Sequence, residues 1–118
     1  MSAPRRGKKP AAPRYQLLWT RRAEADLEAI GDYIAADNPI AAERWVGKLI
    51  EKARAAGDAP LAGRMVPEIR LETVREVFLR TYRLVYRVRG DVVVMLTIFE
   101  GHRRFPSDVD EDDEPEDP

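Results

Sequence analysis

Apolar and polar side chains alternate along the second half of the chain in the way that β-strands require. Residues 82–89, YRLVYRVR, place aromatic and aliphatic side chains on one face and mostly arginines on the other. Residues 92–99, VVVMLTIF, are almost wholly apolar, which is typical of a central strand covered on both faces. Gly90 and Asp91 between them form a two-residue hairpin turn, because glycine readily takes a positive φ. Together with residues 74–79, the pattern predicts three consecutive antiparallel strands.

Two amphipathic helices are predicted ahead of these strands. Residues 21–36 carry one apolar stripe at helical spacing, formed by Ala23, Leu27, Ile30 and Ile34. A second stripe runs through residues 39–56, formed by Ala42, Trp45, Val46, Leu49, Ala53 and Ala56. The break between them is so short that the helices must form an antiparallel hairpin, and their apolar stripes need the sheet as a partner.

Side chains at the element ends support these boundaries. Thr20 and Asn38 stand where helix N-caps are expected, and Pro39 suits a first helical position. Gly57 is a natural stop for the second helix. Residues 15–20, YQLLWT, predict an edge strand before the first helix. Residues 58–71 form a long connection that ends in a short strand near residues 68–71.

The sequence therefore predicts an α+β fold: an N-terminal strand, an antiparallel helix hairpin, then a three-stranded antiparallel sheet, with the helices packed on one sheet face. Its 118 residues suit one folded domain, which we place at residues 15–106. Residues 1–14 are expected to be a disordered basic arm. Residues 107–118 are expected to be a disordered acidic tail.

The formal net charge of −1 hides a strong asymmetry along the chain. Residues 1–14 carry a charge of +5, and residues 107–118 carry eight acids and no base. Residues 64–104 contain nine arginines and five acids. A basic sheet region between tails of opposite sign suggests an acidic partner or a phosphate backbone as its target.

Composition also narrows the class of protein. The chain has no cysteine, so disulfides and thiolate-bound metals are excluded, and a reducing, cytoplasmic location is expected. With a single histidine, a metal site has no support, and no cofactor is expected. No apolar run approaches the roughly 20 residues of a membrane span, and no secretory signal is recognised.

Several short motifs resemble the RelE/ParE superfamily of toxins from type II toxin–antitoxin systems. The matching residues include Trp19-Thr20, Asp26-Leu27, Asn38-Pro39, the run Val74 to Phe78, the run Tyr82 to Arg87, and His102-Arg103-Arg104. The resemblance covers about residues 15–104, and it implies a toxin neutralised by a cognate antitoxin. ParE-type members are associated with inhibition of DNA gyrase, whereas RelE-type members cut messenger RNA in the ribosome.

We expect a ParE-like, gyrase-binding inhibitor that is not an enzyme and that forms a hetero-oligomer with its antitoxin. Two alternatives stay open: a ribosome-dependent messenger-RNA endoribonuclease, and an inactive relative kept for antitoxin binding. RelE-like enzymes use lysines and arginines at the site, but the predicted sheet has no lysine. Arginine stays protonated and is a poor proton shuttle, which weighs against the ribonuclease.

If the chain were a ribonuclease, His102 and Glu100 would be its acid–base pair. His102 is the only histidine, and its reference pKa near ~6.5 suits proton transfer. Glu100 and Arg103 flank it just past the third sheet strand, and Arg83 or Arg87 would hold the phosphate. The plainer interpretation is a solvated histidine at a strand end.

The sheet arginines are the candidates for target or phosphate binding. Arg83, Arg87 and Arg89 share one face of a strand, and we expect this face to be open because the helices cover the other. Arg75 and Arg103 complete the set. The acidic tail could fold back over the shared arginine face and lower its affinity for nucleic acid.

Overall fold

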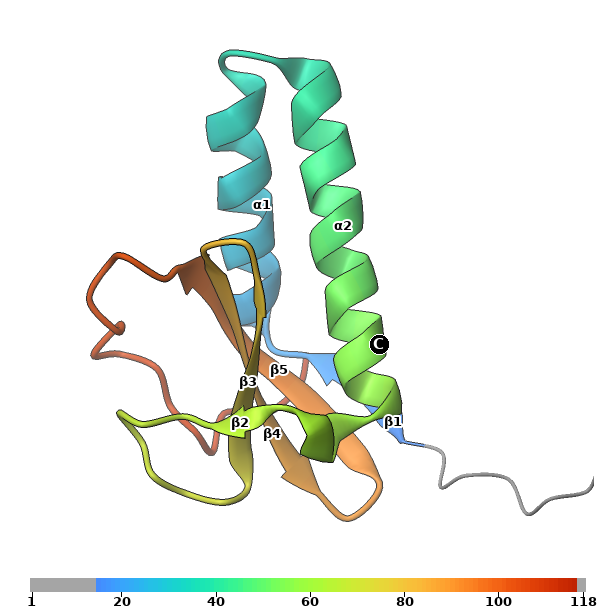
Figure 1. Cartoon of the computed structure of the whole chain (residues 1–118), viewed down its shortest axis with the longest axis vertical. Coiled ribbons are helices and arrows are strands. Elements are labelled where there is room, and N and C mark those ends of the chain that lie inside the picture. The colour runs from blue at the N-terminus through green and yellow to red at the C-terminus, as the bar shows by residue number, and fades with distance from the viewer. Residues whose placement is uncertain (1–14, 117–118) are drawn as a thin grey trace, which may run out of the picture.

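The computed structural model describes residues 15–116, in which a helix hairpin packs on one face of a five-stranded sheet (Figure 1). The elements follow in the order β1 (Gln16–Trp19), α1 (Arg21–Ala35), α2 (Pro39–Asp58), the 3-10 turn η2 (Pro60–Ala62), β2 (Arg64–Met65), β3 (Val74–Leu79), β4 (Tyr82–Arg89) and β5 (Val92–Glu100). The basic arm expected for residues 1–14 lies outside the described residues, as do residues 117 and 118.

The predicted α+β architecture is confirmed: the edge strand predicted at residues 15–20 is β1, and β2 adds a second short edge strand. The strand order is β1-β5-β4-β3-β2, and β1 runs parallel to β5 while the other neighbours are antiparallel. β5 is therefore an interior strand, between β1 and β4, and residues 93–99 are all buried, as their apolar run predicted. Gly90 has φ +58 in the β4–β5 turn, which is the conformation that glycine adopts without strain.

Both predicted helix starts are confirmed by their caps. The Thr20 hydroxyl accepts a hydrogen bond from the backbone N–H of Ala23 at 3.0 Å, and the Asn38 side chain accepts from Ala41 at 3.0 Å. α2 continues to Asp58, past the stop expected at Gly57. Gly57 is buried against β1, where an added Cβ would lie 3.1 Å from Cβ of Leu17. Its small size serves close packing and does not end the helix.

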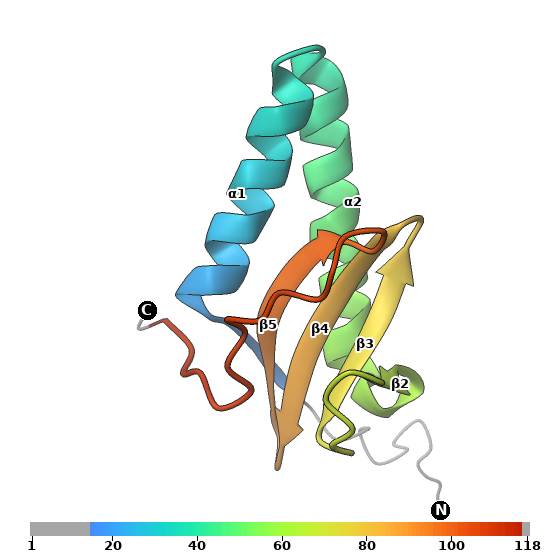
Figure 2. The ribbon, with the colours of Figure 1, turned by 90° about the vertical axis from the view of Figure 1, so that its left-hand side faces the viewer.

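The main core lies between the helix hairpin and the inner face of the sheet. Leu84 and Tyr86 of β4 lie there with Met95 of β5, packed against Leu49 of α2, and all four are fully buried. The Tyr86 hydroxyl donates to the carbonyl of Pro60 at 2.7 Å, which satisfies its one polar group. The upper half of the helix hairpin projects beyond the sheet (Figures 1 and 2).

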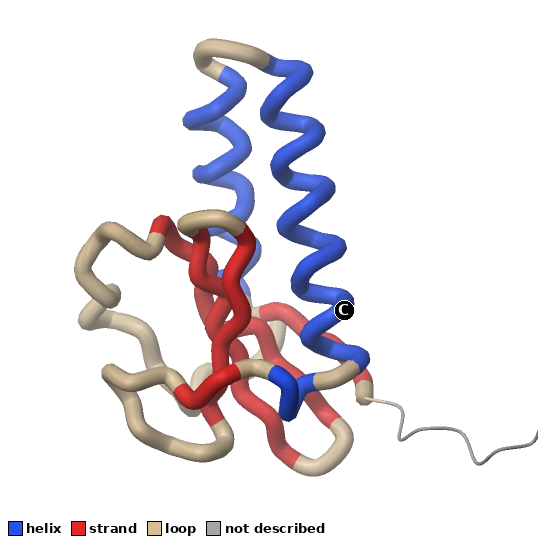
Figure 3. The backbone as a smooth tube through the Cα atoms, viewed as in Figure 1, coloured by secondary structure: helices blue, strands red, loops and turns tan. Residues whose placement is uncertain are grey.

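A second apolar core covers the opposite, outer face of the sheet. Val66, Val74, Val85, Val94, Leu96 and Phe99 form it, and Phe105 and Val109 pack onto it from beyond β5. Residues 105–116, which we call the C-terminal strap, cross this face on the side away from the helices (Figure 2). The strap is loop throughout most of its length (Figure 3), and it ends where Glu116 N donates to Trp19 O at 2.8 Å.

The order of residues 107–116 differs from the disordered acidic tail expected there. Val109 supplies an apolar anchor, and the carbonyls of Glu111 and Asp113 accept hydrogen bonds from a buried arginine of β4. The acidic side chains mostly point to solvent, with Asp108 76% and Asp112 68% exposed. The acid-rich composition suggested disorder because composition does not show that Val109 packs on the outer core or that backbone carbonyls bond to Arg87.

The short strand expected near residues 68–71 is wrong. The strand that pairs with β3 is β2, Arg64–Met65, and residues 67–73 form turns. Arg70 takes φ 62 there, and Glu68 turns its side chain toward β4 instead of extending the sheet. Proline at position 67 has no N–H to donate to a ladder, which accounts for the early end of the pairing.

Candidate functional site

Arg83, predicted to lie on an open cationic face, is buried and paired. Its Nε donates to Oε1 of Glu76 at 2.7 Å, and its two terminal nitrogens donate to the Glu68 carboxylate at 2.9 and 2.7 Å. The side chain is 8% exposed, and these carboxylates raise the pKa of Arg83, with Glu68 the larger cause. Arg83 is therefore a structural cation, and the expectation of an open face at this position is wrong.

Arg87 lies beneath the C-terminal strap, one step further along β4. Its Nη1 donates to the carbonyl oxygens of Glu111 at 2.8 Å and Asp113 at 2.6 Å. Within the described residues, its Nε has no hydrogen-bond partner. Burial lowers the pKa of Arg87, and the neighbouring positive charge of Arg89 lowers it further. The strap therefore covers Arg87 and removes it from solvent.

Arg89 and Arg75, two further predicted binding residues, also make internal contacts. Arg89 pairs with Asp112 of the strap, although about half of its side chain stays exposed. Arg75 projects from the other face of β3, where Nη1 donates to the Gly63 carbonyl at 2.9 Å. Its Nε donates to the Glu72 carbonyl at 3.1 Å. The structure thus does not bring the predicted arginine set together on one accessible surface.

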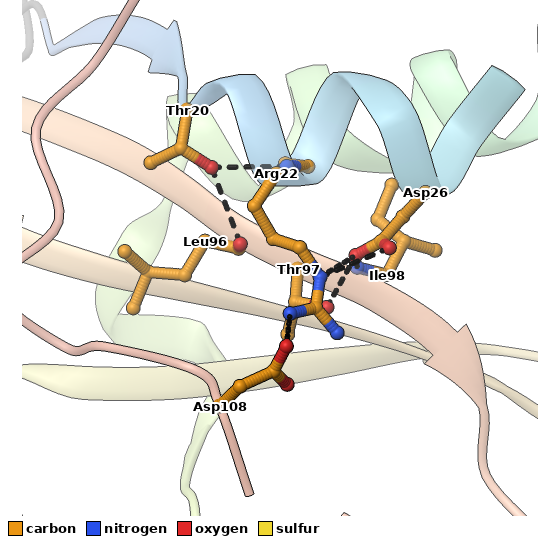
Figure 4. A network of polar contacts seen from close by, with 8 residues as sticks. Thr20, Arg22, Asp26, Leu96, Thr97, Ile98 and Asp108 are labelled. Atoms are coloured by element: carbon orange, nitrogen blue, oxygen red, sulfur yellow. Dashed lines mark hydrogen bonds and ion pairs between the residues drawn. The ribbon is translucent and has the colours of Figure 1, made fainter. Parts of the chain in front are cut away.

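A polar network joins the start of α1 to β5 and to the strap (Figure 4). β1 ends opposite Met95, so the β5 edge has no strand partner beyond that residue. Thr20 Oγ1 donates to the Leu96 carbonyl at 3.2 Å, and Ile98 N donates to Oδ2 of Asp26 at 3.1 Å. The Thr97 hydroxyl also donates to Asp26. Side chains of the α1 region therefore satisfy edge groups that a strand would otherwise bond.

Arg22 extends this network to the strap. Its Nε lies 3.1 Å from both carboxylate oxygens of Asp26, and its Nη1 lies 2.9 Å from Asp108. Hydrogen bonding to Arg22 lowers the pKa of Asp108. The strap is thereby tied both to β4 through Arg87 and to α1 through Arg22.

A groove of about 780 Å³ runs beside this network, between α1 and the loop after β5. One side is a face of α1 and the other is the end of β5 with the loop that follows it. Its lining consists of Arg22, Asp26, Ala29, Ile30, Tyr33, Tyr82, Ile98, Phe99, Glu100, Arg103, Arg104 and Pro106. Tyr33 is 82% exposed at its upper end, and Ile40 is 70% exposed at the start of α2. The groove is apolar at Ala29, Ile30 and Tyr33 of α1 and cationic at Arg103 and Arg104.

Glu100 and His102 form a hydrogen-bonded pair next to the groove. Oε2 of Glu100 lies 2.9 Å from Nδ1 of His102, and Oε1 accepts from the His102 backbone N–H at 2.6 Å. Hydrogen bonds from the Thr81 side chain and then from the His102 backbone lower the pKa of Glu100. Nδ1 of His102 is thus engaged by Glu100, while the His102 side chain is 79% exposed.

Four cations near the end of the sheet at which β5 finishes form no ion pair within the described residues. They are Lys48, Arg80, Arg103 and Arg104. Lys48 Nζ lies 5.2 Å from the Trp45 ring centre, and the Arg80 guanidinium carbon lies 5.7 Å from it. Of these cations only Arg103 was among the predicted site residues. Lys48 belongs to α2, Arg80 to the β3–β4 turn and Arg104 to the loop after β5, so no strand periodicity pointed to them.

Residues 15–116 contain no group of three histidine, cysteine, aspartate or glutamate side chains able to hold a metal ion. None of the helices described is long and apolar enough to cross a membrane. Beside the groove lie the Glu100–His102 pair and the guanidinium groups of Arg103 and Arg104.

Comparisons with known proteins agree on one family. Residues 17–105 match the family model described as the ParE toxin of the type II toxin–antitoxin system, parDE. Y4kP of Sinorhizobium fredii, which is named as a toxin, is 35% identical over 95 residues, covering 79% of this chain and 95% of that protein. Toxin RelE2 of Caulobacter vibrioides is 37% identical over 84 residues, covering 70% and 91%.

A solved structure is similar in both fold and sequence. It is a chain of a chromosomal ParDE toxin–antitoxin system from P. aeruginosa, with a TM-score of 0.64 and 28% sequence identity. The match covers 75% of this chain and 98% of that one. The helix hairpin and the sheet are therefore shared with it, whereas the matched family segment stops at residue 105, where the strap begins.

Proposed function

The chain belongs to the ParE toxin family of type II toxin–antitoxin systems, and on that premise we propose that it arrests growth by binding DNA gyrase. In this proposal it acts as a binding inhibitor without a catalytic step. A cognate antitoxin neutralises it in the cytoplasm by forming a hetero-oligomer.

The use of both central sheet arginines in internal contacts supports a binding role. RNA cleavage by a 2′-hydroxyl needs a base, an acid and cations on the phosphate. Arg83 is held by Glu68 and Glu76, and Arg87 is held by carbonyls of the strap. Neither guanidinium is available to a phosphate, so the clamp that the ribonuclease alternative required from β4 is missing.

The groove beside α1 is our candidate for the antitoxin surface. It combines an apolar strip at Ile30 and Tyr33 with the cations of Arg103 and Arg104. An amphipathic segment with acidic residues on one side would bury the apolar strip and pair with the arginines. The occurrence of a ParDE complex for the similar P. aeruginosa chain supports an antitoxin partner.

A ribosome-dependent endoribonuclease is the second candidate, and one observation favours it. Glu100 holds Nδ1 of His102, whose side chain is 79% exposed and thus accessible to a substrate, and Arg103 is its neighbour. Glu100, His102 and Arg103 would then act as orienting group, base and phosphate clamp.

Transcript 5′-end mapping in cells that express the chain without an antitoxin separates the two functions. We expect growth arrest with intact transcripts, and loss of DNA supercoiling by purified gyrase when the purified chain is added. Codon-phased cuts that disappear in His102→Ala would replace our proposal with the ribonuclease. Normal growth together with undisturbed supercoiling would favour the inactive relative.

A further inference from the structure

Unpaired cations gather at one end of the sheet, although the sequence had pointed to its outer face. β3 and β5 both finish at this end, and β4 starts there, so the β3–β4 turn meets the loop after β5 (Figure 2). Tyr82 pairs with Glu100 across the sheet, and Gly101 N donates to the Thr81 carbonyl at 2.5 Å. Arg80 and the Arg103-Arg104 pair are therefore carried by two adjoining segments.

Trp45 connects this end of the sheet to α2. Its ring centre lies 6.4 Å from that of Tyr82, and Lys48 and Arg80 both lie over the Trp45 ring. We name Lys48, Arg80, Arg103 and Arg104 the cationic rim. Glu100, at the end of β5, accepts hydrogen bonds from His102 and forms no ion pair with an arginine within the described residues.

Arg80 occupies a backbone conformation that usually favours glycine or asparagine. Its φ is +55, in the left-handed region. A guanidinium stands at this strained turn position and is held over an indole ring, which limits its freedom before any partner arrives. The Arg80 guanidinium is therefore held in place by the turn and by Trp45.

We propose that the cationic rim binds the phosphate backbone of nucleic acid, with duplex DNA as its ligand. Three of the four rim cations are arginines, whose planar forks match phosphate oxygens. The contact carries no base readout, because it consists of charge on a sheet end and projects neither a helix nor a strand into a groove. This inference stands on the charge distribution and does not require gyrase to be the target.

A nucleic-acid backbone fits the rim better than an acidic protein segment does. Trp45 and Tyr82 are half-buried beneath the cations, so they offer little apolar area to anchor a protein partner. Arg103 and Arg104 also line the groove, whose apolar strip lies along α1 at Ile30 and Tyr33. Lys48 and Arg80 lie outside that lining. The rim itself offers charge and forked donors, which is what a phosphate chain uses.

The test is a binding titration with the purified full chain and a fluorescent 20-base-pair duplex, read by anisotropy over a range of salt concentrations. The rim variant is R103Q/R104Q. The control variant is R54Q/R70Q, which removes the same charge from two exposed arginines outside the rim. Because all three proteins keep residues 1–14, the basic arm contributes equally to each.

We expect the slope of log Kobs against log salt to fall by about two in the rim variant and to stay unchanged in the control. Arg80→Gly should fold well at φ +55 and should lower the slope by about one. Equal losses in the rim and control variants would overturn the proposal, as would failure of the wild-type chain to bind duplex at low salt.

Two further titrations test whether another polyanion, RNA or an acidic polypeptide, binds the rim in place of duplex DNA. Single-stranded RNA bound more tightly than duplex DNA, with the same loss in the rim variant, would overturn the choice of DNA and would favour the ribonuclease. Polyglutamate that binds through the rim while duplex does not would make the rim a protein surface. Because gyrase is absent from these titrations, their outcome is independent of the supercoiling assay.

Discussion

Arg83 Nε donates to Glu76 Oε1 at 2.7 Å on the outer face of the sheet, and Glu76 is fully buried there. Glu76 also accepts from Arg64 Nε at 2.7 Å, so one carboxylate joins β2, β3 and β4. Removing one member of a buried ion pair leaves an uncompensated charge and costs more than the pair itself contributes.

Glu76→Gln should therefore destabilise the chain by about 3 kcal/mol, because Arg83 and Arg64 lose the buried anion that they share, while Glu68 still compensates Arg83. Urea unfolding followed by circular dichroism gives the free energy of unfolding. The matched control is Glu51→Gln, whose partner Arg54 is exposed, and it should change stability by less than about 0.5 kcal/mol. Equal effects of the two substitutions would contradict this account of Glu76.

Glu68 should make stability depend on pH in the acid range. Its hydrogen bonds to Arg83 hold the pKa of Glu68 below its ordinary value of 4.5. A depressed folded-state pKa stabilises the chain above the unfolded value, and this contribution disappears as pH falls through the folded pKa. Below about pH 4.5, wild-type stability should thus decline more steeply than that of Glu68→Gln. If the free energies of unfolding of the wild type and of Glu68→Gln changed in parallel from about pH 6 to about pH 2.5, this role of Glu68 would be excluded.

Asp26 should matter more to stability than its position on a surface helix suggests. Asp26→Asn replaces an oxygen that accepts from Ile98 N with an amide, and it removes the anion beside Arg22. We expect a loss of about 2 kcal/mol in thermal or urea unfolding. Asp32→Asn, an exposed substitution on the same helix, serves as the control and should be close to neutral.

The strap should be held by its backbone and by Val109, and much less by its acidic charges. Deleting residues 107–118 removes Val109 from the outer core and takes two acceptors from buried Arg87, so we expect a loss of at least about 3 kcal/mol. Neutralising Asp108 and Asp112 to asparagine, with Asp110 treated alike, should cost less than about 1 kcal/mol, because those pairs are exposed. If the variant with the three asparagines were as unstable as the deletion, the acidic charges would be the main contribution of the strap and this account would be wrong.

His102→Ala should leave growth arrest and gyrase inhibition unchanged if the chain is a binding inhibitor. The His102 side chain is 79% exposed and contacts Glu100 alone among ion-pair partners, so the fold does not depend on it. A ribonuclease would lose roughly 10²–10⁴-fold in rate with its general base. Colony counts after induction, beside a supercoiling titration, distinguish the two.

The fold could be predicted in outline because its signals are local. Alternation in residues 82–89, the apolar run of β5 and the caps Thr20 and Asn38 each depend on a few neighbouring residues. The parallel pairing of β1 with β5 brings together segments far apart in the chain, and the sequence supplied an edge strand without its partner.

The candidate site was harder to predict because burial of the arginines depends on segments distant in sequence. Arg83 is covered by Glu68, fifteen positions away, and Arg87 by the backbone of residues 111 and 113. Neither loop has a periodic pattern. The charge of the tail suggested electrostatic attraction to the arginines, whereas the buried guanidinium of Arg87 bonds to carbonyl oxygens, which every residue possesses.

The position of the C-terminal strap in the chain also makes closure of the outer core a late step of folding. A chain emerges from its N-terminus, so the helix hairpin and all five strands are synthesised before the strap. Phe105 and Val109 pack on the outer core, and Glu116 N reaches Trp19 O, only after all of these elements exist. A nascent or truncated chain that lacks the strap therefore exposes part of the apolar outer face of the sheet.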